Sequence, residues 1–211
     1  MGLYEEFKAV LDTAKNEHDV DSYLKSHKNL MRGIDGLYWN CMVIQPEFQI
    51  GTEYRSDFVI LCACSGCWKC VLIELQSPTD PIFNKNRQFS RGMNEAYNQL
   101  SDWKSYIEMN EASFRYQLAK LVKGKPAYCS NAAVHTQASE EIRDPMTVIQ
   151  YEYRVMLGRR EMLDAENNRK RQLYQYEIMT YDRLLRYAKN YDNACNAITK
   201  ALLDAKEDHH G

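Results

Sequence analysis

The chain has 211 residues, of which 45% are hydrophobic, and a formal net charge of −2. A chain of this length can bury a full hydrophobic core, and it favours one folded domain. It contains no apolar run long enough to span a membrane, and the N-terminus lacks a basic start followed by an apolar stretch, so we expect a cytoplasmic protein with no membrane partner. Its seven cysteines are then expected to be reduced thiols.

The first part of the chain predicts helices. Apolar residues recur at helical spacing over residues 3–14, and residues 21–30 fit a second short helix before two glycines interrupt the pattern. We therefore expect a helical N-terminal extension over residues 1–36. It should pack on a single globular unit that comprises residues 37–211.

Strands follow the predicted helices. Residues 37–44 read as a strand, and residues 56–64 and 67–76 are rich in β-branched and apolar residues, as strands require. The last two segments flank Ser65-Gly66, which fits a two-residue β-hairpin turn.

The register of this hairpin brings acidic side chains together. With a two-residue turn, paired positions sum to a constant, so Asp57 opposes Glu74. Gln76 lies on the same face as Glu74, because side chains alternate along a strand. If the turn gained or lost one residue, Asp57 would move to the opposite face and the predicted site would vanish.

The rest of the chain alternates helices and strands. A proline-containing loop at 77–81 precedes one or two helices within 90–122, strands at 127–134 and 151–157, a charged helix at 163–174, a short strand at 176–179 and a final helix capped by Thr180 or Asp182. This order predicts an α/β fold of the α+β type, a mixed sheet with helices on both faces.

The chemistry of the paired acids points to a metal ion. Divalent cations such as Mg²⁺ prefer oxygen ligands, and Asp57, Glu74 and the backbone carbonyl of Leu75 supply three. A carboxylate at the end of an apolar, central strand is expensive to bury without a partner, and a bound cation explains that cost. Such an ion would polarise a scissile phosphate and lower the pKa of the attacking water, with Gln76 positioning that water.

Five segments together resemble a known nuclease superfamily. They are 55–58 (RSDF), 71–78 (VLIELQSP), 96–107 (AYNQLSDWKSYI), 155–160 (VMLGRR) and 178–185 (IMTYDRLL). In this order and spacing they resemble the PD-(D/E)XK nucleases, and more narrowly the Shedu anti-phage defence nuclease domain.

The resemblance implies a restriction-endonuclease-like αβββαβ core that hydrolyses DNA with Mg²⁺, or Mn²⁺ in its place. Asp57 and Glu74 would be metal ligands, and Gln76 would occupy a position that usually carries lysine. Gln99 would contact nucleic acid or brace the centre, and Glu47 is a candidate additional carboxylate near the metal.

The resemblance also implies partners. Nucleases of this kind commonly act in pairs on duplex DNA, so we expect a homo-oligomer. Larger Shedu proteins carry an N-terminal regulatory region for which this chain is too short, and we therefore expect a separate regulatory partner to supply the trigger.

Basic residues are segregated along the chain. Residues 82–125 and 154–189 each carry a net charge of +4, which could build a face for DNA phosphates. The candidate nucleic-acid contacts are Lys85 and Arg87 after the site loop, and Arg159 and Arg160 in a glycine-containing turn. Solvated helix faces and surface ion pairs are the competing interpretation.

The cysteines at 62, 64, 67 and 70 have spacings that also occur in zinc and iron–sulfur sites. The hairpin register places Cys70 on the face opposite the other three, so we expect no structural zinc. The leading hypothesis is therefore a metal-dependent DNA endonuclease in anti-phage defence. The alternatives are a catalytically weak nucleic-acid-binding or assembly subunit that keeps the fold, and a cysteine-based redox or metal sensor.

Overall fold

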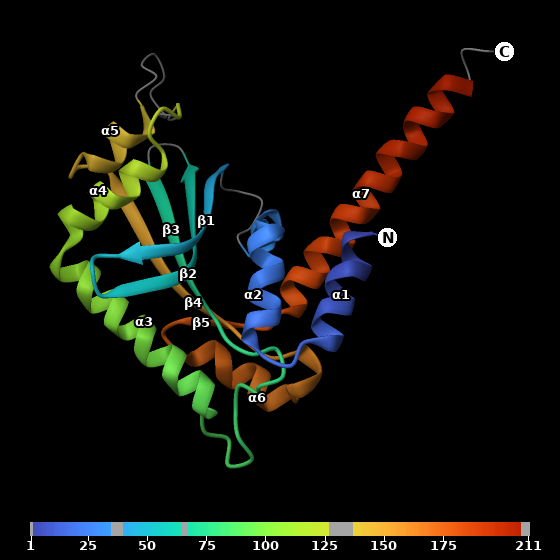
Figure 1. Ribbon diagram of the computed structural model, residues 1–211, viewed down its shortest axis with the longest axis horizontal. Coiled ribbons are helices and arrows are strands. Elements are labelled where there is room, and N and C mark those ends of the chain that lie inside the picture. Colours follow the sequence, from blue (N-terminus) through green and yellow to red (C-terminus); the bar gives the residue numbers. More distant parts are fainter. Residues whose placement is uncertain (1, 35–39, 65–66, 127–136, 208–211) are drawn as a thin grey trace.

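The computed structural model describes residues 2–34, 40–64, 67–126 and 137–207. Its centre is a five-stranded mixed sheet in the order β1-β2-β3-β4-β5 (Figure 1). The strands are β1 (Asn40–Ile50), β2 (Tyr54–Cys64), β3 (Cys67–Leu75), β4 (Val148–Met156) and β5 (Glu177–Met179). The first three strands pair in antiparallel fashion, whereas β4 is parallel to both β3 and β5. The predicted mixed sheet is confirmed.

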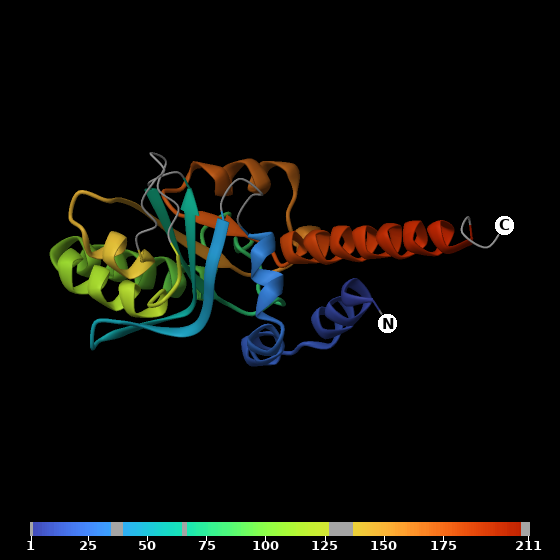
Figure 2. The same ribbon diagram turned by 90° about the horizontal axis from the view of Figure 1, so that it is seen from above.

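Helices cover both faces of the sheet, as the sequence predicts (Figures 1 and 2). The helical elements in chain order are α1 (Leu3–Thr13), α2 (Glu17–Ser26), the 3₁₀ helix η1 (Lys28–Gly33), α3 (Arg91–Met109), α4 (Glu111–Leu121), α5 (Ala138–Arg143), η2 (Arg160–Met162), α6 (Ala165–Lys170), η3 (Arg171–Leu173) and α7 (Asp182–Glu207). No helix in the described part of the chain is long and apolar enough to cross a membrane.

The β2–β3 hairpin has the predicted register. Cys64 pairs with Cys67 and Phe58 pairs with Ile73, so the sum of paired positions stays constant along the arms. Continued by one position, this register sets Asp57 opposite Glu74. The predicted site requires this register, because a shift by one residue would move Asp57 to the opposite face of the sheet.

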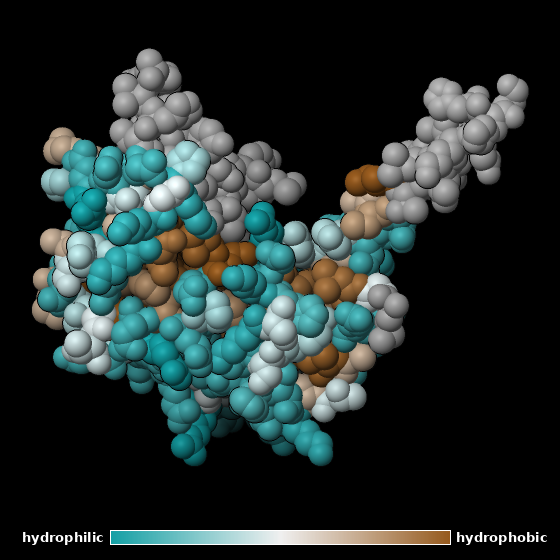
Figure 3. Space-filling model, turned by 45° about the horizontal axis from the view of Figure 1, so that its top comes forward, coloured by the Kyte–Doolittle hydropathy of each residue, from teal (hydrophilic) through white to brown (hydrophobic). Residues whose placement is uncertain are grey.

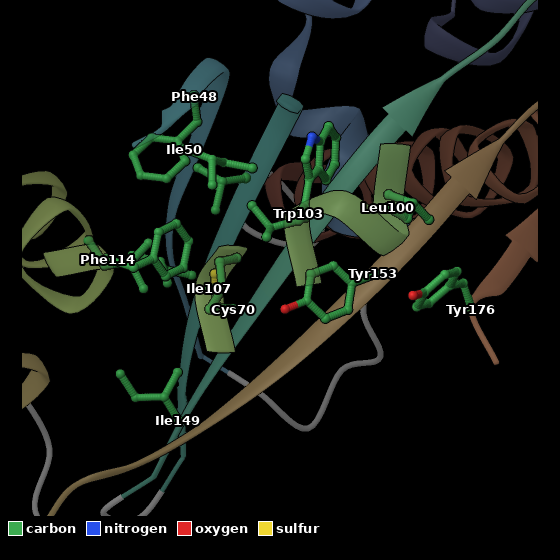
Figure 4. Close-up of a cluster of buried hydrophobic side chains, with 14 of the residues drawn as sticks. Phe48, Ile50, Cys70, Leu100, Trp103, Ile107, Phe114, Ile149, Tyr153 and Tyr176 are labelled. Atoms are coloured by element: carbon green, nitrogen blue, oxygen red, sulfur yellow. The ribbon is translucent and has the colours of Figure 1, made fainter. Parts of the chain in front are cut away.

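Alternation along the strands divides the core into two hydrophobic clusters. Val59 and Leu61 face α3, α4 and α5, and their cluster contains Trp103 and Phe114 (Figure 4). The side chains of Phe58 and Ile60 face the other way, into a cluster built with α1, α2, η1 and α7. Because the alternate residues of β2 and β3 are apolar on both faces, the sheet must be covered on both sides.

Cysteines of the hairpin follow the same division. Cys62 is buried in the cluster beneath α1 and α7, whereas Cys70 is buried in the cluster beneath α3. The two thiols therefore lie on opposite faces of the sheet.

Some elements begin or end at other residues than the sequence predicts. A helix cap sets one of these boundaries, and the position of a strand at the edge of the sheet allows another. The second helix begins at Glu17 rather than at residue 21, because the Asn16 side chain accepts a hydrogen bond from the Asp19 N–H at 3.2 Å. Strand β1 continues through Pro46, which an edge strand tolerates. The helix predicted over 163–174 is two short pieces, α6 and η3. The strand predicted at 127–134 lies outside the described residues.

A glycine turn joins the end of β4 to the loop that follows β3. Gly158 has a φ of +63°, and a β-carbon added there would lie 2.5 Å from the backbone oxygen of Asp80. Its N–H donates to the Ser77 carbonyl at 3.1 Å. This contact fixes the loop that begins directly after Gln76.

We predict that Gly158→Ala destabilises the protein by about 2 kcal/mol or more, since the β-carbon adds an overlap with backbone to the strain of a positive φ. Gly124→Ala is the matched control, because Gly124 also has a positive φ, of +80°, but nothing lies within 4 Å of its added β-carbon. Urea unfolding of both variants measures the difference. Equal losses of stability would show that the Asp80 contact is unimportant.

Candidate metal centre

Asp57 and Glu74 lie together at the open end of the β2–β3 hairpin. Oδ2 of Asp57 accepts a hydrogen bond from the Leu75 N–H at 2.7 Å, which ties β2 to β3 just beyond the last ladder pair. The Glu74 side chain is buried, with 7% of the residue exposed. The structure therefore brings these two predicted ligands into one place, with the backbone of Leu75 between Glu74 and Gln76.

The two carboxyl groups strongly influence each other. Burial raises the pKa of Glu74 far above its ordinary value, and the charges of Asp57 and Glu17 raise it further. Burial also raises the pKa of Asp57, although the Leu75 N–H opposes that shift by stabilising the charged form. The raised pKa values favour the protonated form of each carboxyl group, and a bound cation could take the place of the proton.

Two amides brace Glu74. Gln99 on α3 donates from Nε2 to Glu74 Oε2 at 3.0 Å, and the side chain of Gln76 also hydrogen-bonds to Glu74. A β-carbon added at Gly92, in the first turn of α3, would lie 3.0 Å from Gln76 Oε1. Gln99 thus contacts Glu74, and Gln76 lies between Glu74 and the start of α3.

Helix α2 contributes an acid that the sequence analysis missed. Burial raises the pKa of Glu17 to about 7, and the charges of Asp57 and Asp21 add to that shift. Glu17 is therefore close enough to Asp57 for the two side chains to interact electrostatically. Glu17, Asp21 and Lys25 are spaced four residues apart and therefore form one polar stripe on α2. That periodic stripe was the signal in the sequence that could have identified them.

Asp21 and Lys25 form the outer part of this acidic cluster. Asp21 is buried, and its Oδ2 lies 2.6 Å from Lys25 Nζ. Its other oxygen, Oδ1, is buried with no hydrogen-bond partner in the described structure. An orphaned carboxylate oxygen beside other acids is a position that suits a cation or a cation-bound water.

Tyr181 is a second residue that the sequence analysis missed. It is fully buried, and its hydroxyl donates to the backbone carbonyl of Gln76 at 2.7 Å. The charges of Glu17 and Asp57 act on Tyr181 and add to the effect of burial in raising its pKa. Tyr181 therefore holds the backbone of Gln76 from the side opposite α3, just before α7 begins.

Glu47 takes part in ion pairs with basic side chains. Its Oε1 lies 2.8 Å from Lys25 Nζ and 3.8 Å from an Arg55 nitrogen, and its φ is +50°. Lys25 thus links Glu47 to Asp21 and the acidic cluster. The charge of Lys25 also lowers the pKa of Asp57, against the larger effect of burial.

The candidate phosphate-binding residues differ in their accessibility. Lys85 is exposed, and Arg87 is exposed but forms an ion pair with Glu166. The side chain of Arg159 is only 13% exposed and bridges Asp12 at 3.1 Å and Asp182 at 3.7 Å. Arg160 hydrogen-bonds to Asn168. The turn at 158–160 is therefore tied to α1, α6 and α7 of its own chain.

The residues present fit a hard divalent cation. Two carboxylates, a neighbouring backbone carbonyl and water molecules make an adequate ligand set for Mg²⁺, which usually retains several waters. Among the described residues, no three acidic, histidine or cysteine side chains form a ready-made cage. Asp57 and Glu74 would hold the ion, and the raised pKa values and the orphaned Asp21 oxygen are the observations that support a cation here.

Fold and site together define a mixed α/β protein whose central hairpin ends in a buried carboxylate pair braced by a helix. Over residues 14–185 the sequence matches the family described as Shedu protein SduA, C-terminal. The chain belongs to this family, which suggests a role in anti-phage defence. A comparison with curated proteins found no match.

We predict that the metal-free protein loses stability as the pH rises from about 5 to about 8. Glu17 has its pKa raised from 4.5 to about 7, so the stabilisation by its retained proton is complete below pH 4.5 and is lost as the pH passes through 7. Because Glu17 is half-buried, solvent screening limits the effect to roughly 1–2 kcal/mol.

Urea unfolding in EDTA at the two pH values measures this slope. Glu17→Gln should make the slope shallower, leaving the part that Asp57 and Glu74 contribute, whereas Glu140→Gln, on an exposed position of α5, should leave it unchanged. An unchanged slope in Glu17→Gln would contradict the assignment of Glu17 to the acidic cluster.

Proposed function

We propose that this protein is a metal-dependent endonuclease that hydrolyses phosphodiester bonds in DNA as part of anti-phage defence. The observation that carries the proposal is the Asp57–Glu74 pair, in which Glu74 is buried and Asp57 half-buried, held in register by the hairpin and braced by Gln99. A buried like-charged pair is costly without a cation, and hydrolysis of phosphodiesters is a reaction that such a cation serves.

Each side chain has a defined task in this proposal. Asp57 and Glu74 hold Mg²⁺ or Mn²⁺ together with the Leu75 carbonyl, and the ion when bound supplies charge for the phosphate and acidity for its water. Gln99 fixes the rotamer of Glu74. Gln76, anchored at its backbone by Tyr181, orients the attacking water but contributes no positive charge.

The basic residues would act at the substrate backbone. Lys85 and Arg87 lie on the loop between β3 and α3, and both are exposed. We propose that this loop contacts DNA phosphates. Arg159 has its guanidinium engaged by two acids of its own chain and so supports the fold around the site.

A specific observation favours the second candidate function, a catalytically weak nucleic-acid-binding or assembly subunit. Position 76 carries an uncharged amide where the family pattern usually has lysine. An amide can hydrogen-bond to water and phosphate but cannot neutralise developing charge.

We predict Mg²⁺- or Mn²⁺-dependent cleavage of linear and supercoiled DNA by the purified protein. Glu74→Gln and Asp57→Asn should each reduce the rate at least about 100-fold, since each removes a ligand charge. Glu140→Gln makes the same chemical change on exposed α5 and should cut at the wild-type rate. Cleavage retained in both site variants would refute the site, and DNA binding without cleavage in any metal would favour the second candidate.

We predict that Gln76→Lys increases the cleavage rate, by about tenfold or more, because an ammonium adds positive charge beside the attacked phosphate. Gln76→Met, which is similar in length but lacks both charge and amide, should fall below the wild-type rate. Single-turnover rates at saturating Mg²⁺ test the order Lys above Gln above Met. A Lys variant no faster than Met would show that position 76 does not act on the reacting groups.

A further inference from the structure

Helices α1 and α7 and the segment that joins α2 to η1 line a cavity of about 630 Å³. Ligand pockets in proteins have volumes of roughly 300–1,000 Å³, so this cavity is large enough for a small organic molecule. In the space-filling view, apolar side chains gather on the surface where the projecting helix α7 leaves the body of the protein (Figure 3). None of the residues assigned to the candidate metal centre lines this cavity.

The walls of the cavity are held in place by contacts with α7. The carboxylate of Asp192 accepts hydrogen bonds from the N–H groups of Leu3 and Tyr4, at 3.1 and 2.8 Å, which fixes the start of α1. On the other side, η1 packs closely on α7, because a β-carbon added at Gly33 would lie 2.5 Å from the β-carbon of Tyr187. The cavity is therefore preformed, and a ligand does not have to order its walls.

The cavity carries positive charge that no neighbouring acid balances. His27, Lys28 and Arg32 line it, and none of the described residues that line it is acidic. Lys28 and Arg32 are exposed, and neither forms an ion pair within the described part of the chain. An anion would therefore be attracted to this cavity.

The imidazole of His27 has a defined orientation at the edge of the cavity. Its ring stacks on Tyr23, with the ring centroids 4.0 Å apart and the planes 16° from parallel. Nδ1 lies 3.1 Å from the Tyr23 carbonyl, and because a carbonyl can only accept, Nδ1 carries the hydrogen. Nε2 has no hydrogen-bond partner among the described residues, so it is the ring nitrogen available to a ligand.

Two tyrosines of α7 form the aromatic wall of the cavity. Tyr187 and Tyr191 lie four residues apart and therefore on one face of the helix. Tyr187 is half-buried, whereas Tyr191 is 52% exposed. Leu3 and Leu30 add aliphatic surface. The exposed ring of Tyr191 offers a surface on which a planar aromatic group can stack.

We propose that this cavity binds a mononucleotide, with its phosphate at Lys28 and Arg32 and its base against Tyr187 and Tyr191. A nucleotide combines a phosphate, which ammonium and guanidinium groups bind through charge-assisted hydrogen bonds, with a planar base that stacks on aromatic rings. Inorganic phosphate would leave the aromatic wall unused, and an uncharged aromatic molecule would leave the cations unused.

The cavity is separate from the proposed nuclease centre. Glu17, which interacts with Asp57, begins α2, whereas Ser26 ends it, roughly 13 Å farther along the helix at 1.5 Å per residue. Nucleotide binding can therefore be measured without metal and without cleavage. Failure of nucleotide binding would leave the nuclease proposal standing, and failure of cleavage would leave the nucleotide site standing.

Equilibrium dialysis of the metal-free protein in EDTA with labelled AMP and GMP tests the proposal. We expect a dissociation constant in the micromolar range for at least one of them. Inorganic phosphate and adenosine each carry one half of the ligand and should bind at least about tenfold more weakly. Absence of nucleotide binding up to about 1 mM would overturn the proposal, and so would phosphate or adenosine that binds as tightly as the nucleotide.

Two pairs of variants locate the bound nucleotide. Lys28→Gln removes a cation of the cavity and Tyr191→Leu removes a ring, and each should weaken binding about tenfold. Lys123→Gln and Tyr116→Leu make the same changes at exposed positions near and on α4, on the opposite face of the sheet, and should leave binding unchanged. Tyr116 is a close match, since it is also 52% exposed. Equal losses in the cavity and control variants would overturn the proposal.

A short single-stranded oligonucleotide distinguishes a free nucleotide from a nucleotide unit of a nucleic-acid strand. We expect it to compete only weakly with the mononucleotide, because the cavity has room for little more than one nucleotide. An oligonucleotide that binds more tightly than the mononucleotide, and that loses affinity in Lys28→Gln, would assign the cavity to a nucleic-acid strand and overturn the proposal.

Discussion

The withdrawal of two neighbouring carboxyl groups, Asp57 and Glu74, from water is the constraint on which the centre of this protein depends. The register of the β2–β3 hairpin brings Asp57 and Glu74 together, with Glu74 buried and Asp57 half-buried. The surrounding residues compensate with hydrogen bonds, from the Leu75 N–H to Asp57 and from Gln99 to Glu74. These donors stabilise the charged forms only in part, and the pKa values of both acids remain raised. A bound divalent cation would neutralise the negative charge that these hydrogen bonds leave uncompensated.

The hairpin and the arrangement of layers could be predicted because they follow from local rules. Alternation fixed which residues of β2 and β3 face each side, and the turn length fixed the pairing of Asp57 with Glu74. The contribution of α2 could not be predicted in this way. Glu17 and Tyr181 reach the centre only because a helix and a strand end far apart in sequence dock on the sheet, and no local pattern specifies that docking. The stripe of polar residues on α2 was visible, but a solvent-exposed helix face has the same pattern.

The contacts of Arg159 and Arg160 could not be predicted from the sequence either. A glycine turn followed by Arg159 and Arg160 suggested close approach to a DNA backbone, yet Gly158 is approached by the carbonyl of Asp80, and Arg159 bridges α1 and α7. The tight approach does require glycine at position 158. The approaching group, however, belongs to the chain itself.

Gln76 is held at two points. Its side chain hydrogen-bonds to Glu74, and its backbone carbonyl accepts a hydrogen bond from Tyr181.

The central claim is that Asp57, Glu74 and the Leu75 carbonyl share one divalent cation. A crystal structure of the protein soaked in Mn²⁺, with the ion located by its anomalous scattering, tests this most directly. We predict one ion bonded to an oxygen of each of these three residues, with water in the remaining positions. An ion bound elsewhere, or an anomalous map without a peak at this hairpin while the protein still cleaves DNA with Mn²⁺, would contradict the account.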